Sequence, residues 1–187
     1  MYADRTLIPT EVIRLCALGT LTLAPMTYGE LAQEVRTFTG RMWGPTLDMM
    51  GTSIELLRTE GLIEADAPVN KGADQGTDKA SEATLHLTTS GEAELRDLLT
   101  ANLRNALDDV SRIVFALKLR FLHVLEPAVA CEQIDRLIEI SEADKARRDE
   151  TKARYIDEPG HFSAWLDADI DRANERVAWL TALKARL

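Results

Sequence analysis

The sequence lacks the features that would place it in a membrane or direct it across one. No uninterrupted apolar run reaches the roughly 18 residues that a bilayer-spanning helix needs. Glu11, Arg14 and Thr20 interrupt the best N-terminal stretch. That stretch also lacks the basic start, apolar middle and cleavage site of a signal peptide. We therefore expect a cytoplasmic protein without a membrane partner.

Cysteine and histidine are scarce, which argues against a disulfide or a metal site. The two cysteines, Cys16 and Cys131, lie within apolar helical patterns, where a thiol usually behaves as a small buried hydrophobe. His86, His123 and His161 fall in separate predicted elements, and none has a second ligand at metal-binding spacing. We expect neither a disulfide, nor a metal, nor a cofactor.

Motifs of catalysis are also missing. The sequence contains neither a glycine-rich phosphate loop nor a serine in a nucleophile-elbow motif. Asp167, Asp169 and Asp171 alternate along a predicted helix, so they fan around its axis and cannot converge on one ion. A solvated helix face is the simpler interpretation. We therefore predict a protein that is not an enzyme and has no catalytic residues.

Basic residues are outnumbered by acidic ones. The chain carries 22 Lys+Arg against 31 Asp+Glu, a net charge of −9. Residues 1–88 hold 7 basic and 12 acidic residues, and residues 89–187 hold 15 and 19, so the acidity is spread over both halves. Any site for a polyanion must be a local positive patch within a repulsive field.

Three predicted helices and a hairpin occupy the first half. Helices are expected over residues 10–23 and 28–38, and a third from after Pro45 to Glu60 because apolar residues recur on one face. Short strands follow at 62–66 and 83–87, separated by a loop-like segment without apolar periodicity. This order predicts a winged helix-turn-helix with a two-stranded wing.

The second half is helical throughout. The predicted helices are 90–102, 107–125, 128–156 and 161–186. The last two carry narrow apolar stripes that a compact monomer of this length should not be able to bury, so we expect a homodimer. The chain is predicted to be mainly α, with a winged-helix domain at 1–90 and a helical dimerisation domain at 91–187. The candidate dimer contacts are Phe162, Trp165, Leu166, Ile170, Val177 and Leu180.

Several short motifs follow one another over nearly the whole chain. They are YGEL at 28–31, LRTEGLI at 57–63, LTTSGEAEL at 87–95, FALKLRF at 115–121 and ERVAWL at 175–180. In order and spacing these motifs resemble PadR-type transcriptional regulators, in the branch of that family with a long C-terminal tail. The resemblance implies a dimeric DNA-binding protein, usually a repressor and sometimes released by a small ligand.

The third helix departs from the family pattern. Members of the family carry Ser or Thr and a Tyr early in this helix, but residues 48–51 read Asp-Met-Met-Gly. The outward face adds Glu55 and has Arg58 as its only cation. An alternative hypothesis is therefore a degenerate winged helix that binds a basic protein partner through an acidic face and does not bind DNA specifically.

The best local patch for DNA is the segment 36–46, which holds two arginines, three threonine hydroxyls and no acid. Thr46, near the start of the third helix, is a candidate phosphate clamp. A solvated loop is the alternative interpretation, as a solvated tip is for the wing lysines. The candidate DNA contacts are Tyr28, Arg36, Arg41, Thr46, Thr52, Arg58, Lys71 and Lys79.

Trp43 lies at a turn with methionines nearby. One interpretation is a pocket for a small aromatic ligand, and the other, which we favour, is core packing.

Overall fold

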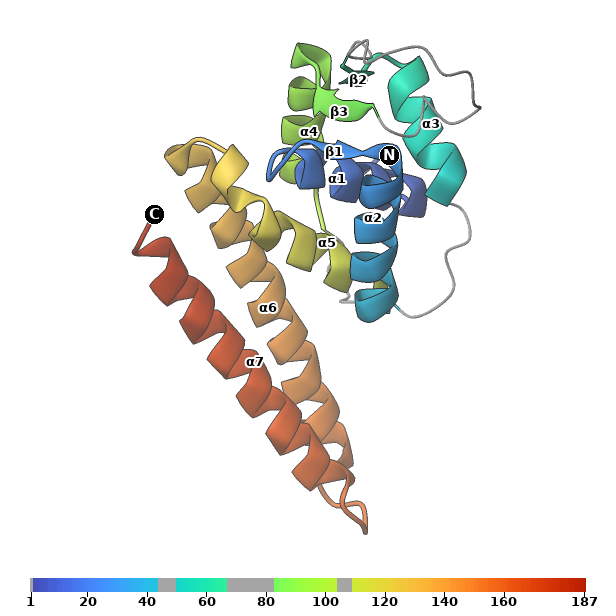
Figure 1. The fold of residues 1–187 in the computed structure, drawn as a ribbon. Coiled ribbons are helices and arrows are strands. Elements are labelled where there is room, and N and C mark those ends of the chain that lie inside the picture. Colours follow the sequence, from blue (N-terminus) through green and yellow to red (C-terminus); the bar gives the residue numbers. More distant parts are fainter. Residues whose placement is uncertain (1, 44–49, 67–82, 104–108) are drawn as a thin grey trace, which may run out of the picture. The chain divides into compact units, whose positions relative to one another are not determined.

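The computed structural model describes residues 2–43, 50–66, 83–103 and 109–187 (Figure 1). These ranges are mainly helical, as predicted, with one small antiparallel sheet. In chain order the elements are α1 (Pro9–Leu21), β1 (Met26–Thr27), α2 (Tyr28–Trp43), α3 (Met50–Thr59), β2 (Ile63–Ala65), β3 (Thr84–Leu87), α4 (Thr89–Thr100), α5 (Asp109–Arg120), the short 3₁₀ helix η1 (Leu122–Val124), α6 (Pro127–Tyr155) and α7 (Phe162–Lys184).

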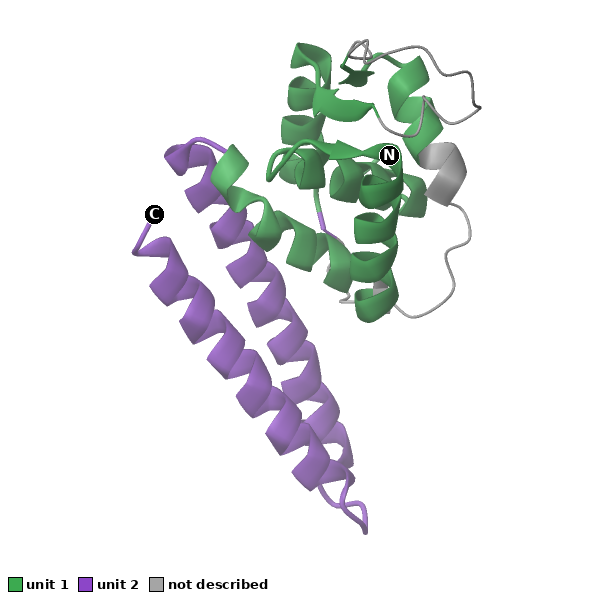
Figure 2. Cartoon of the chain, viewed as in Figure 1, with its two compact units in different colours: residues 1–102, 112–124 green, residues 103–111, 125–187 purple. Residues whose placement is uncertain are grey.

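The chain divides into two compact units (Figure 2). Unit 1 consists of residues 1–102 with 112–124, and unit 2 of residues 103–111 with 125–187. This division differs from the expected boundary at residue 90. All of α4 and most of α5 group with the N-terminal elements, because their apolar faces lie in the core of unit 1.

Helix α1 is the centre of unit 1. Every residue from 15 to 21 is buried, because apolar side chains cover nearly all faces of the helix. The helix contacts α2, α3, α4 and β3. Its start follows the usual rules, with Pro9 at the first position and the Glu11 carboxylate accepting a hydrogen bond from the Ile8 N–H at 2.9 Å.

Helix α2 starts where predicted but is longer. The Glu30 carboxylate accepts hydrogen bonds from Thr27 N–H (2.8 Å) and Thr27 Oγ1 (3.0 Å), so this pair caps the helix. The predicted stop at Thr39-Gly40 is wrong. Thr39 is buried and its hydroxyl donates to the Val35 carbonyl at 2.8 Å, which lets the helix continue to Trp43.

The sheet has a third strand that was not predicted. Its order is β1-β3-β2, with Met26 opposite Leu85 and Ile63 opposite Leu87. Because β1 has only two residues, it leaves no alternating pattern in the sequence. Strands β2 and β3 form the predicted hairpin, while the connecting residues 67–82 lie outside the described residues.

A junction of α3, the sheet and α4 depends on Thr88. Gly61 ends α3 with a φ of 71°, the left-handed conformation expected of a helix-terminating glycine. The Thr88 hydroxyl donates to the Gly61 carbonyl at 2.7 Å and accepts from the Gly91 N–H at 3.0 Å. The Thr88 N–H donates to the Leu62 carbonyl at 3.1 Å. One side chain therefore caps α4 and holds it against the end of α3.

Helices α6 and α7 form an antiparallel hairpin in unit 2 (Figure 1). Part of each apolar stripe is buried within this hairpin, where α6 and α7 contact each other. The expected homodimer stays a prediction. Leu166, Ile170 and Leu180 lie in this internal core, whereas Phe162 and Trp165 are 43% and 55% exposed. Val177 is half-buried.

Three ion pairs join α6 and α7. Arg148 pairs with Asp169, Lys152 with Asp167, and the Lys184 ammonium lies 2.6 Å from both carboxylate oxygens of Asp135. Asp167 and Asp169, which were predicted to lie on a solvated helix face, are thus both paired. A slip of one helix by a turn would break all three contacts, so these pairs favour the observed register.

One of these pairs predicts a pH dependence. The hydrogen bond from Arg148 holds the pKa of the Asp169 carboxyl below its usual range. A lowered folded-state pKa contributes stability above the unfolded value of about 4, and this stability is lost as the pH falls through the folded-state pKa. Asp169→Asn should lower the free energy of unfolding at neutral pH by up to about 1 kcal/mol.

The measurement is urea unfolding of wild type and variant, followed by circular dichroism between neutral pH and about pH 2. The two proteins should converge at the acid end. Asp171→Asn is the control, since Asp171 is exposed and no ion pair to it occurs among the described residues. A difference that persists unchanged at about pH 2 would contradict the assignment to this carboxylate.

Candidate nucleic-acid interface

Helix α3 packs by one face and leaves the other in solvent. It contacts α1, α2 and β2. Ile54 and Leu57 are buried, whereas Glu55, Arg58 and Thr59 are exposed. This is the position of a recognition helix, whose inner face belongs to the core and whose outer face is free to enter a groove.

Tyr28 and Glu55 bring the start of α2 next to α3. Burial raises the pKa of the Tyr28 hydroxyl, and the nearby Glu55 carboxylate raises it further. At neutral pH this hydroxyl is therefore protonated and able to donate a hydrogen bond. These two groups act on a bound phosphate in opposite ways. The Tyr28 hydroxyl can donate a hydrogen bond to the phosphate, whereas the negative charge of Glu55 repels it.

The second half of α2 presents positive charge. Arg36 and Arg41 are exposed, and Arg36 Nη1 donates to the Gln33 side-chain oxygen at 3.4 Å. Neither arginine has an ion pair with a described residue. The nearest acid in sequence, Glu34, is instead engaged by Arg120 Nη2 at 2.8 Å. The two arginines therefore keep their charge for an external partner.

Arg58 adds a third exposed cation, on α3. The Glu60 carboxylate that follows it in sequence pairs with Arg14, so it does not neutralise Arg58. Within the described ranges Arg58, too, takes part in no ion pair. Glu34 and Glu60 thus pair with arginines elsewhere in unit 1 and do not neutralise the exposed arginines of α2 and α3. This surface is therefore less acidic than the net charge of the sequence indicates.

The remaining predicted contacts are only partly described. Tyr28, Arg36 and Arg41 lie on α2, and Arg58 lies on α3. Thr52 belongs to α3, but its side chain lies outside the described residues. Thr46, Lys71 and Lys79 lie outside them as well, as do Met49 and the side chain of Trp43, and Met42 is 47% exposed.

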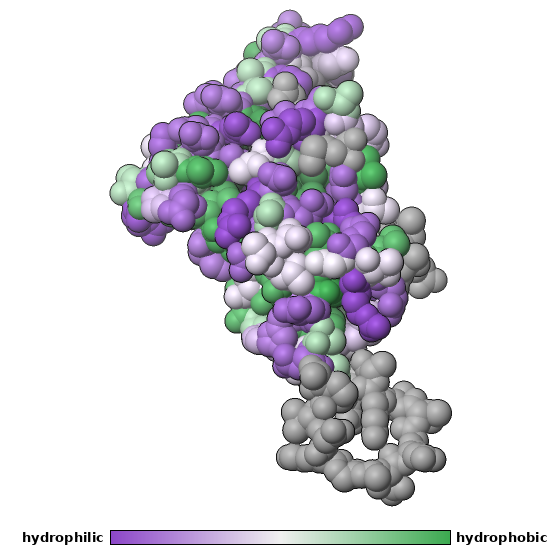
Figure 3. Space-filling view, turned by 90° about the horizontal axis from the view of Figure 1, so that it is seen from above, coloured by the Kyte–Doolittle hydropathy of each residue, from purple (hydrophilic) through white to green (hydrophobic). Residues whose placement is uncertain are grey.

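The surface is polar on the face shown in Figure 3, where hydrophobic residues are scattered among hydrophilic ones. Among the described helices, none is both long and apolar enough for a bilayer crossing. In the same residues, His, Cys, Asp and Glu side chains form no group of three that could hold a metal ion.

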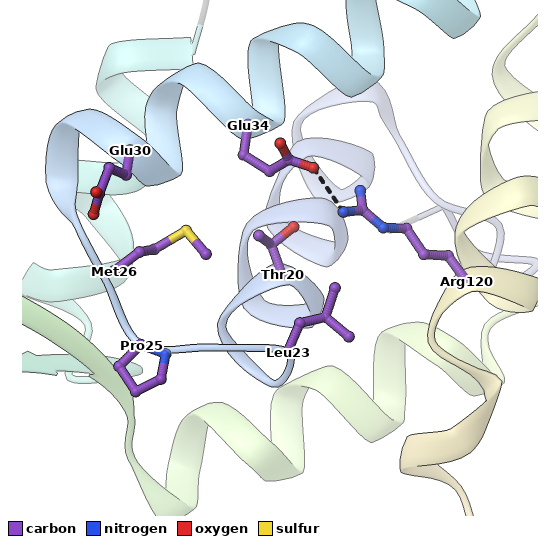
Figure 4. A pocket seen from close by; sticks show the side chains of 7 residues that line it. All are labelled: Thr20, Leu23, Pro25, Met26, Glu30, Glu34 and Arg120. Carbon is purple, nitrogen blue, oxygen red and sulfur yellow. Dashed lines mark hydrogen bonds and ion pairs between the residues drawn. The ribbon is translucent and has the colours of Figure 1, made fainter.

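Sequence reasoning missed a pocket at the edge of α2 (Figure 4). Its volume is about 370 Å³. Arg120 reaches it from α5, and its guanidinium carbon lies 4.7 Å from the centre of the Phe38 ring. The only signal in the sequence was a pair of basic residues, Lys118 and Arg120, inside the otherwise apolar segment 115–121. The lining residues are Thr20, Leu23, Pro25, Met26, Glu30, Glu34 and Arg120.

The order of helices and strands in unit 1, with its exposed third helix, places the chain in the winged-helix class. The family model of the AphA-like transcriptional regulators matches residues 2–184, and the chain belongs to this family. This confirms the transcriptional regulator predicted from the sequence. A search of curated proteins found no match.

Solved structures of PadR from Bacillus subtilis are similar to this chain. A crystal structure of PadR has 18% sequence identity, covers 97% of this chain and 97% of PadR, and has a TM-score of 0.40. PadR in complex with operator DNA has 20% identity, 96% and 100% coverage, and a TM-score of 0.39. PadR in complex with p-coumaric acid has 18% identity, 97% and 98% coverage, and a TM-score of 0.39.

Proposed function

We propose that this protein is a DNA-binding transcriptional repressor that acts as a homodimer and responds to a small ligand. The observation that carries the DNA-binding part is the set of exposed arginines on α2 and α3, which no described acid neutralises. They lie on the two helices that a winged helix presents to duplex DNA. PadR, which this chain resembles, has been solved with operator DNA.

The arginines have different tasks in this proposal. Arg36 and Arg41 contact phosphates and set the orientation of the unit on the duplex, while α3 enters the major groove with Arg58. Lys71 and Lys79, which lie outside the described residues, stay candidates for contacts with flanking phosphates. Because the whole chain is acidic, phosphates away from this patch are repelled, which limits nonspecific binding.

The homodimer is supported by exposed aromatic residues on the helical hairpin. Phe162 and Trp165 stack with ring centroids 5.8 Å apart, and Trp179 is 48% exposed. Large exposed aromatic side chains are typical of interface anchors. Two copies related by a two-fold axis would address half-sites about one helical turn apart, roughly 34 Å.

The test is a fluorescence anisotropy titration of the full chain with a duplex from its own upstream region and with a random duplex. At about 150 mM salt the specific duplex should bind at least about 1,000-fold more tightly, and log Kd should vary linearly with log salt. Sedimentation in parallel should give the mass of two chains. Equal affinity for the two duplexes would refute sequence-specific DNA binding.

A second candidate function is the recognition of a basic protein partner. Glu55 on α3 and Glu64 and Asp66 at the base of the wing are exposed carboxylates, which supports it. The same titration separates the two functions, because a protein-binding module would bind neither duplex tightly. If the protein binds a basic partner, Glu55→Gln should reduce the capture of that partner from cell extract. If the protein binds DNA, Glu55→Gln should cause no loss of a protein partner.

Glu55 also yields a prediction for DNA binding. Glu55→Gln removes a carboxylate from the face that approaches phosphate, so affinity for duplex DNA should rise about threefold, the effect of one screened repulsion. Anisotropy at two salt concentrations measures this. Glu139→Gln removes an exposed carboxylate from α6 as the control and should change little. Weaker DNA binding by Glu55→Gln would mean that this carboxylate accepts a hydrogen bond from a base.

A further inference from the structure

The pocket of Figure 4 contains two polar groups that find no strong hydrogen-bond partner within the described part of the protein. Arg120 Nη1 and Thr20 Oγ1 are buried, and neither has a nitrogen or oxygen hydrogen-bond partner among the described residues. Within the same ranges the Thr20 hydroxyl has only the thiol of Cys16, a weak acceptor, beside it. Thr20 is only 1% exposed. A buried donor without a partner destabilises a protein, so such groups point to a partner that arrives from outside.

The Arg120 guanidinium is held in place before any ligand arrives. Its Nη2 donates to Glu34 at 2.8 Å, and its plane lies near the rings of Phe38 and Phe121, at 4.7 and 5.1 Å from their centroids. These contacts orient Nη1 without satisfying it. A donor that is already positioned costs little side-chain entropy when an acceptor binds.

The charges around the pocket determine which sign of ligand charge is favoured. Arg120 and Glu34 neutralise each other, which leaves the carboxylate of Glu30. The hydrogen bond from the Thr27 N–H holds the pKa of Glu30 below its usual range, so this group stays charged at neutral pH. The pocket therefore carries a net charge of −1, which favours a cationic ligand and disfavours a carboxylate.

The lining also sets the shape of the ligand. Glu30 and Arg120 lie at opposite ends in Figure 4, with Leu23, Pro25 and Met26 along the side between them. Apolar side chains, one of them a methionine, suit an apolar or aromatic body. The volume of about 370 Å³ falls in the range of small-molecule sites.

We propose that this pocket binds a small organic cation with an apolar body, whose far end carries an oxygen that accepts a hydrogen bond from Arg120. The Thr20 hydroxyl bonds the same oxygen, and the cationic group faces Glu30. The ligand would touch α2, the helix that carries Arg36 and Arg41, and so could alter DNA binding. Binding itself is independent of DNA and can be tested whether or not the proposed function holds.

The experiment is isothermal titration of the full chain, without DNA, using three probes with one body. Tyramine is the cation, 2-(4-hydroxyphenyl)ethanol its neutral analogue and 4-hydroxyphenylacetate the anion. Tyramine should bind once per chain with a Kd of about 1 mM or below, as expected for about ten non-hydrogen atoms. The neutral analogue should bind about fivefold more weakly, and the anion should not saturate the site.

Two variants assign the contacts. Glu30→Gln keeps an oxygen to cap α2 but should reduce tyramine affinity about fivefold, to that of the neutral analogue. Thr20→Val should weaken both probes about fivefold, because it removes the hydroxyl that bonds the ligand oxygen. Thr100→Val, in α4 and outside the pocket, is the control for threonine removal.

Three results would overturn the proposal. The first is absence of saturable tyramine binding to the wild type. The second is binding of the anion as tightly as the cation, which would refute the charge assignment. The third is wild-type affinity in Thr20→Val, shown by its melting curve to be folded, which would place any binding elsewhere.

Discussion

Replacing Arg36 and Arg41 together with alanine should weaken the binding of duplex DNA about 30-fold for each copy of the chain that contacts it, at roughly physiological salt. Each arginine that neutralises one phosphate adds about 0.9 to the slope of log Kd against log salt. The double variant should therefore lower the slope by about 1.8 per copy. Both the specific and the random duplex should be affected, because phosphate contacts do not read sequence.

The matched control for charge is Arg186→Ala, which removes a cation just after α7. Among the described residues, the Arg186 side chain donates only to the Ala182 carbonyl of α7. Circular dichroism should show equal helix content in all variants. If the double variant keeps the wild-type salt slope, the second half of α2 does not contact the backbone. A loss confined to the specific duplex would assign the arginines to bases instead.

Gly91→Ala should be the most destabilising single substitution among those considered. A Cβ at residue 91 would lie 2.0 Å from the Leu62 carbonyl oxygen, a backbone atom that cannot move as a flexible side chain can. Relief would require α4 to separate from Leu62 and would break the bonds from Thr88 to the Gly61 and Leu62 carbonyls. We expect a loss of about 3 kcal/mol and a fall in Tm of about 6–12 °C.

Gly40→Ala is the control for the glycine substitution, and it should act in the opposite direction. Nothing lies within 4 Å of a Cβ at residue 40, which is exposed within α2. Alanine there should stabilise the helix by about 0.5–1 kcal/mol, because it restricts the unfolded chain. Thermal melts of both variants measure the contrast. An unchanged Tm in Gly91→Ala would show that α4 and Leu62 can separate at little cost.

The parts of the fold that follow from local chemistry were predictable. Gly61 ends α3 because a left-handed residue was needed there, and Thr27 starts α2 through a capping pair with Glu30. The apolar run of α1 correctly indicated a helix, although full burial shows only when α2, α3 and α4 surround it. Such features depend on residues within one or two turns, which a sequence displays directly.

Features set by contacts between distant residues were not predictable. Strand β1 exists because Met26 pairs with Leu85, fifty-nine positions away in sequence. The α6 and α7 stripes look unpartnered until the chain turns back and each covers the other. Arg120 became part of a site only when α5 brought it to Glu34, eighty-six residues away. Each of these features depends on contact between residues that are far apart in the sequence, so no local pattern of residues predicts it.

In the hairpin of α6 and α7, the side chains that stabilise the fold differ from those that are available for assembly with another chain. Its internal leucines and isoleucines secure the fold, and its outward aromatics are not needed for that task. In the proposed homodimer, substitutions at Phe162 or Trp165 should therefore change which chains pair with each other while the hairpin stays folded.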